Sequence, residues 1–202
     1  MLEKILELLS RRKSSSTVYN PYGNKDTCNN LKLYFGWLLK HNHHVLMIGE
    51  ASGYRGCRLT GIPFTSGDII KNSKHKIFKN IGSKIKLHKV AFENTAAILW
   101  EILEVNKPVP ILWNAFPFHP HISGVPESNR SPSAVEIEEG KQYLLMVYNL
   151  FKPIKLCSIG RIGETILRES FPNKQITYIR HPSHGGKKEF EIGIKAVLQC
   201  KS

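Results

Sequence analysis

Residues 44 to 67 read HVLMIGEASGYRGCRLTGIPFTSG. The first six form a largely apolar run, and the segment from 49 onward holds five glycines, one carboxylate and two arginines. Glycine is used where the backbone turns with a positive φ or where another group approaches it closely. The stretch therefore predicts a buried strand that ends in a loop built around a ligand or a reacting group.

The rest of the chain alternates helical patterns with short apolar runs. Besides the strand at 44–49, we expect strands at 109–116, 155–160 and 175–180, and helices at 26–40, 94–106, 133–151, 162–171 and 187–199. Ser133 and Glu136 have the spacing of a capping box. Continuous apolar strands between amphipathic helices are typical of a parallel sheet covered on both faces. The sequence thus predicts an α/β fold, a three-layer α/β/α arrangement around a four-stranded, mainly parallel sheet.

The chain has 202 residues and a mass of 23.0 kDa, which suits one well-buried core. We expect a single domain over 1–202, with an N-terminal helical extension at about 1–42 and a basic insertion at about 69–91. The first residues, MLEKILELLSRRK, have helical spacing and none of the features of a signal peptide. The expected location is cytoplasmic, or nucleoid-associated in a prokaryote.

The charge balance favours a polyanionic partner. Lysine and arginine number 29 against 16 acidic residues, giving a formal charge of +13. No apolar run is long enough to span a bilayer, so we expect DNA, single- or double-stranded, and no membrane. Seven lysines and no acid lie between Asp68 and Glu93. That run is either a solvated face or a surface that contacts phosphates.

The cysteines give no sign of a metal site. Positions 28, 57, 157 and 200 contain no CxxC pair and no Cys/His pair at zinc-finger spacing. Reduced thiols are the simpler interpretation. We expect no metal and no other cofactor.

Four segments leave the carboxyl ends of the expected strands: GEASGYRG, NAFPFHP, GRIGE and HPSHGG. Ligands of open parallel sheets bind beyond those ends. Three of the segments carry groups that can do chemistry, namely Glu50, Asn114 and His181. We expect these three segments to converge.

Several motifs resemble, in order, those of the uracil-DNA glycosylase superfamily. They are the glycine loop from Gly49 to Phe64 with its TGIPF ending, the asparagine in WNAFP, the NRSP segment at 129–132 with Glu136, and HPS at 181–183. Together they span about 44 to 190. They are closest to the single-strand-selective and thermophilic branches, without the cysteines of the iron-sulfur branch. The resemblance implies the fold of that superfamily and base excision in DNA repair.

Physical chemistry assigns a role to each motif. Chemistry at a base requires the nucleotide to be flipped out of the stack. Phe64 would stack on that base, and the amide of Asn114 would accept from N3–H of uracil and donate to O4. His181 would donate to O2 of the departing base. The structural alternatives are a core phenylalanine, an asparagine that caps a turn and a surface histidine.

Further residues follow from their places in these motifs. Ala51, Ser52 and Gly53 are expected to line the base pocket. The expected DNA contacts are Arg55, Arg58, Ser183, His184, Gly185, Gly186 and Lys187.

The chain departs from the family pattern at three places. Ala51 stands where the best-known branch has a water-activating aspartate, so Glu50 or Asp68 would position the water. Gly53 stands where that branch excludes thymine with a tyrosine. The segment from His184 to Lys187 offers no apolar side chain to fill the gap that a flipped base leaves, so another element supports the opened stack or single strands are preferred.

The expected protein is therefore a monomeric, monofunctional uracil-DNA glycosylase that leaves an abasic site. No lysine stands at the motif positions to act as a nucleophile, so we do not expect a lyase step. Two alternatives stay open: a glycosylase for hypoxanthine or xanthine, and a catalytically silent DNA-binding relative.

Overall fold

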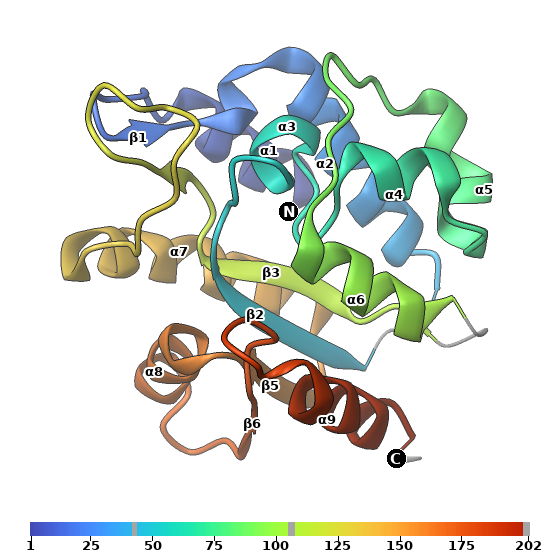
Figure 1. Cartoon of the computed structure of the whole chain (residues 1–202). Coiled ribbons are helices and arrows are strands. Elements are labelled where there is room, and N and C mark those ends of the chain that lie inside the picture. Colours follow the sequence, from blue (N-terminus) through green and yellow to red (C-terminus); the bar gives the residue numbers. More distant parts are fainter. Residues whose placement is uncertain (42–43, 105–107, 200–202) are drawn as a thin grey trace.

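A computed structural model describes residues 1–41, 44–104 and 108–199. Its centre is a parallel sheet of four strands in the order β3-β2-β5-β6 (Figure 1). The strands are β2 (Val45–Ala51), β3 (Ile111–Phe116), β5 (Lys155–Ile159) and β6 (Ile176–Ile179). The four predicted strands are confirmed, with ends that differ by one or two residues.

The strand register brings the expected site residues to one edge of the sheet. Gly49 on β2 lies opposite Asn114 on β3, and Ala51 lies opposite Phe116. On its other side β2 pairs with β5, and β5 pairs with β6. Because all four strands are parallel, the segments that follow them leave the sheet at the same edge.

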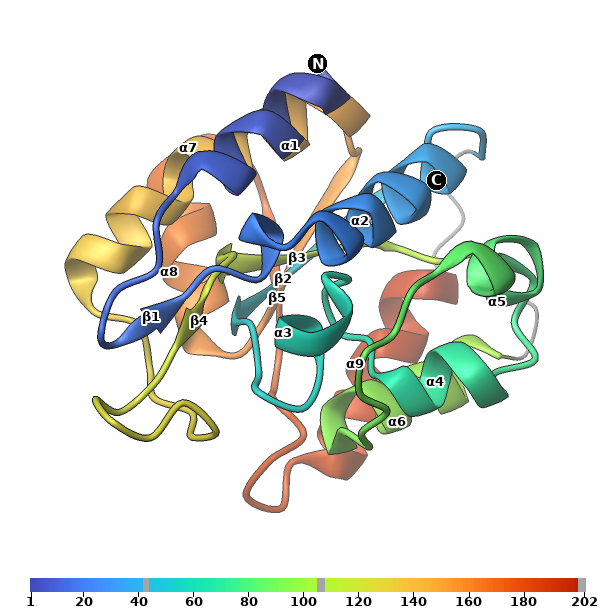
Figure 2. The ribbon, with the colours of Figure 1, turned by 90° about the horizontal axis from the view of Figure 1, so that it is seen from above.

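Helices cover both faces of the sheet. In Figure 2, α7 (Ala134–Phe151) and α8 (Arg161–Ser170) lie on one face, and α6 (Asn94–Leu103) and α9 (Lys187–Gln199) lie on the other. This confirms the predicted three-layer α/β/α architecture. The capping box at the start of α7 is present, with Ser133 and Glu136 bonded reciprocally. The last residues of the predicted helix 94–106 lie outside the described residues.

The N-terminal residues are packed into the structure. α1 (Leu2–Arg11) buries three aliphatic side chains, and α2 (Lys25–Leu38) follows a 3₁₀ turn, η1 (Pro21–Gly23). Between them, β1 (Val18–Tyr19) pairs antiparallel with β4 (His119–Pro120). The sequence analysis did not expect either strand, because two residues show no period. Their pairing anchors the segment that follows β3.

The lysine-rich segment folds into short helices that the sequence analysis did not expect. They are α4 (Gly67–Asn72), α5 (Lys76–Ile81) and the 3₁₀ turn η2 (Gly82–Lys84). Another short helix, α3 (Cys57–Thr60), lies before this segment, within the glycine loop. Apolar side chains such as Ile77 and Phe78 are buried, whereas all seven lysines are exposed. The exposed lysines fit both a solvated face and a phosphate-contacting surface.

Within the described ranges, no helix combines the length and the apolar character needed to cross a membrane. The same residues contain no group of three or more His, Cys, Asp or Glu side chains arranged to hold a metal ion. Cys28, Cys57 and Cys157 are free thiols. Cys200 lies outside the described residues.

Helix α7 approaches the sheet at Gly140. A Cβ atom at this position would lie 1.8 Å from the carbonyl oxygen of Ala115 on β3. We predict that Gly140→Ala lowers the free energy of unfolding by about 1–3 kcal/mol, because the helix must move off the sheet. Urea denaturation measures the change. Gly36→Ala in α2 is the matched control, since nothing lies within 4 Å of its added Cβ, and an equal loss there would contradict this account.

Candidate active site

The segments after β2, β3 and β6 surround one cavity of about 340 Å³. Small-molecule sites have volumes of about 300–1,000 Å³. The expected residues that line the cavity are Glu50, Ala51, Ser52, Gly53, Phe64, Asn114 and His181. The fourth segment, GRIGE, contributes no lining residue. The structure therefore brings together the three segments that the sequence analysis expected to converge.

Phe64 forms a floor of the cavity at the end of β2. A Cβ atom at residue 49 would lie 2.2 Å from the Phe64 ring, so only glycine allows the ring to rest there. Phe64 has φ 52°, a left-handed conformation that costs roughly 1–2 kcal/mol for a residue with a side chain. The indole N–H of Trp100 donates to the Phe64 carbonyl at 2.9 Å and helps to hold it. Strained residues of this kind gather at functional sites.

Asn114 is 3% exposed and lies beside the Phe64 floor. Its side-chain amide makes no hydrogen bond to any other described residue, and Asn114 lines the cavity. A buried amide that caps a turn would be bonded to the backbone, so that alternative does not fit this residue. The amide is available to a ligand that has both a donor and an acceptor.

His181 lines the cavity from the segment after β6, and two contacts fix its tautomer. The backbone N–H of Ser183 donates to Nδ1 at 3.2 Å, and the Ser183 hydroxyl lies 2.8 Å from the same nitrogen. The neutral ring therefore carries its proton on Nε2. Burial lowers the pKa of His181 below its usual 6.5, while the charges of Glu50 and Glu93 partly oppose this. The ring is thus a neutral donor at pH 7.

Two carboxylates line the cavity, and only Glu50 is free to act. Within the described part of the chain, the Glu50 side chain has no hydrogen-bond or ion-pair partner. Glu93, which the sequence analysis did not single out, caps α6 by accepting from the N–H groups of Thr95 and Ala96 at 3.0 and 2.7 Å. An acidic residue directly before a helical pattern is the signal that marks such a cap.

Asp68, the second carboxylate expected to position water, does not line the cavity. It lies in the first turn of α4, where it accepts from the side-chain amide of Asn72 at 2.8 Å. Ser52 lines the cavity, but its hydroxyl donates to the carbonyl of Pro117 at 2.8 Å. Its contribution to the pocket is therefore the position of its backbone.

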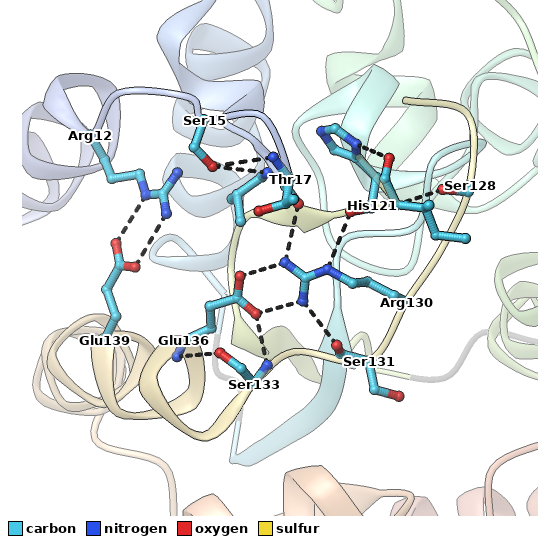
Figure 3. A network of polar contacts seen from close by, with 12 residues as sticks. Arg12, Ser15, Thr17, His121, Ser128, Arg130, Ser131, Ser133, Glu136 and Glu139 are labelled. Atoms are coloured by element: carbon cyan, nitrogen blue, oxygen red, sulfur yellow. Dashed lines mark hydrogen bonds and ion pairs between the residues drawn. The ribbon is translucent and has the colours of Figure 1, made fainter. Parts of the chain in front are cut away.

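A network of polar contacts braces the wall formed by residues 129–131 (Figure 3). Arg130 makes a bidentate ion pair with Glu136, at 2.6 and 2.8 Å, which lowers the pKa of that carboxyl. The same guanidinium donates to the carbonyls of Thr17 and His121. Next to it, the side chain of Asn129 accepts from the N–H of Tyr54 at 3.0 Å. These bonds tie the wall to α7, to the N-terminal segment and to the glycine loop.

None of the expected DNA-contacting residues lines the cavity. Arg55 and Arg58 lie over the rings of Tyr54 and Tyr19, each at 5.1 Å, and neither has an acidic partner among the described residues. Ser183 to Gly186 lie in the turn between β6 and α9, in which His184 and Gly185 have positive φ, and Lys187 is the first residue of α9. Lys187 is exposed and lies 3.7 Å from Glu191.

Comparisons with known proteins place this architecture. No protein-family model and no curated protein matches the chain. Among solved structures, it is similar to the crystal structure of wild-type Pedobacter heparinus SMUG2, with a TM-score of 0.63 and 14% identity over 98% of each chain. The chain has a uracil-DNA glycosylase-like fold. The fold that the sequence analysis predicted is therefore confirmed over nearly the whole length.

We predict that ¹⁵N NMR of His181 shows a neutral ring protonated on Nε2 at pH 7, with a titration midpoint below 6.5. Because the folded state binds this proton less readily than the unfolded chain, the group's contribution to stability is lost as the pH falls below 6.5. The signals are assigned by their absence from His181→Gln. Ser183→Ala keeps the backbone donor and should keep the tautomer; a proton on Nδ1, or a midpoint above 6.5, would refute the assignment.

Proposed function

We propose that the protein is a monofunctional DNA glycosylase that removes uracil from DNA. The observation that carries the proposal is the buried, unpaired amide of Asn114 beside a ring held in a strained conformation. Because Asn114 lines the cavity, a ligand bound there can complete the hydrogen bonds of this amide. The similarity of the fold to SMUG2 supports the same conclusion.

Base recognition follows from the chemistry of the pocket. The base would leave the helix stack and lie on Phe64, where stacking contributes about 1–3 kcal/mol. Oδ1 of Asn114 would accept from N3–H of uracil, and Nδ2 would donate to O4. Cytosine carries an acceptor and a donor in the reverse order, so the same amide orientation disfavours it.

Hydrolysis then requires charge on both sides of the breaking bond. As the C1′–N1 bond breaks, its electron pair stays on the base and the sugar becomes cationic. The Nε2–H group of His181 donates to O2 of the departing base. Glu50 accepts a proton from water whose oxygen bonds to C1′, and it stabilises the cationic sugar. The base leaves as an anion and takes up one proton while Glu50 returns one to solvent, so the products are an abasic sugar and the free base.

One feature supports the alternative of a larger base. An added Cβ at Gly53 would meet no atom within 4 Å, so this part of the cavity wall leaves room beside the ligand. Hypoxanthine and xanthine, as larger deaminated bases, would occupy such room. Their edges also combine a donor with an acceptor, as Asn114 requires.

An end-labelled oligonucleotide assay tests the proposal. Single-stranded and duplex substrates carry uracil, hypoxanthine or xanthine, and alkali cleaves the abasic sites. We predict uracil-dependent breaks that fall by about 10²–10³-fold in Asn114→Ala and His181→Ala. Glu50→Gln should lose about 10²–10⁴-fold, as expected for a general base. Asp68→Asn is the matched control and should keep its activity, because its carboxylate lies outside the cavity.

Other outcomes separate the alternatives. Breaks at hypoxanthine or xanthine in preference to uracil would assign the site to a larger base. Steeply salt-dependent binding to DNA without breaks would identify a silent relative. Full activity in Asn114→Ala would contradict the proposed recognition.

A further inference from the structure

The loop 121–128 carries two exposed aliphatic side chains at its tip. Ile122 and Val125 are 55% and 50% exposed. They pair across an isolated antiparallel bridge, and Gly124, with φ 76°, turns the chain between them. Residues paired across such a bridge have their side chains on the same face, so the two form one small apolar surface.

Both ends of this loop belong to the cavity wall. Pro120 precedes the loop, Asn129 and Arg130 follow it, and all three line the cavity. Figure 2 shows the loop projecting from the molecule on the same side as the turn 181–186 that carries His181. A DNA strand that delivers a base into the cavity therefore passes close to the tip.

The tip is held by hydrogen bonds rather than left free. The N–H of Ile122 donates to the Ser128 hydroxyl at 2.9 Å, and that hydroxyl donates to the carbonyl of Val125 at 2.7 Å. Arg130 donates to the carbonyl of His121, which joins the loop to the network in Figure 3. The apolar surface is thus presented on a rigid support.

Extruding a nucleotide from a duplex leaves a gap in the base stack. An apolar group that fills this gap excludes water from it. Proteins that open base steps insert side chains such as isoleucine, leucine or phenylalanine. The turn 182–186, PSHGG, holds no large exposed apolar side chain. We propose that Ile122 and Val125 together form a wedge that enters the duplex beside the extruded nucleotide. The inference rests on the proposed function, because it requires a base to be extruded.

Another exposed apolar side chain lies next in sequence to a residue that lines the cavity. Phe92 is 53% exposed and precedes Glu93, which lines the cavity. It lies in a segment without regular structure, whereas the tip of loop 121–128 is internally bonded. Ile122 and Val125 are therefore the better supported wedge, and Phe92→Ala serves as the rival variant.

The test compares the rates of uracil release from duplex and single-stranded oligonucleotides. In the double variant Ile122→Ser/Val125→Ser, we expect the duplex rate relative to the single-strand rate to fall by about tenfold, because the opened stack loses its support. Ile154→Ser is the matched control: Ile154 is 64% exposed and precedes β5, at the opposite edge of the sheet. That variant should keep the wild-type ratio. Thermal melting checks that each variant folds.

A second measurement depends on DNA binding alone and does not require cleavage. A 2-aminopurine base beside the target uracil in a duplex should brighten when the wild-type protein opens the stack, and the double variant should lose this signal. The wedge is overturned by an unchanged ratio and signal in the double variant, by their loss in Phe92→Ala instead, or by a wild type that acts on single strands alone. A wild type that releases no uracil from either substrate contradicts the proposed function, and the 2-aminopurine signal still tests the wedge.

Discussion

The arrangement of the site depends on the contact between the Phe64 ring and Gly49. Any side chain at residue 49 would collide with the ring, which therefore rests directly on the end of β2. The pairing of Gly49 with Asn114 then sets the amide beside that ring. A strand register and one strained residue together define the floor and one edge of the cavity, so both are fixed before a ligand arrives.

The cavity and the protein surface differ in charge. The chain carries a formal charge of +13, and the lysines of the segment between Asp68 and Glu93 are exposed, which favours a polyanionic partner. Inside, Glu50 and Glu93 provide negative charge, and His181 stays neutral because burial lowers its pKa. A reaction that creates a cationic sugar and an anionic base is suited to carboxylates on one side and a neutral donor on the other.

Much of the fold could be predicted from the sequence because the central strands are continuous apolar runs and the helices have clear ends. The capping box at Ser133 and the strand ends at Asn114 and His181 are local signals. The pairing of β1 with β4 could not be predicted, since two-residue strands have no period and their partners are a hundred residues apart. Glu93 was missed for a similar reason: only the fold brings this helix cap into the same cavity as Glu50. The network around Arg130 likewise depends on segments that meet only in three dimensions.

In the proposed function, the Asn114 amide recognises the edge of the base. NMR of protein labelled with ¹⁵N at asparagine side chains tests it directly, with the Asn114 signals assigned by their absence from Asn114→Ala. Titration with free uracil should shift the two amide protons of Asn114 more than those of any other asparagine, and cytosine should not. Equal shifts with cytosine, or shifts confined to asparagines elsewhere, would contradict the account.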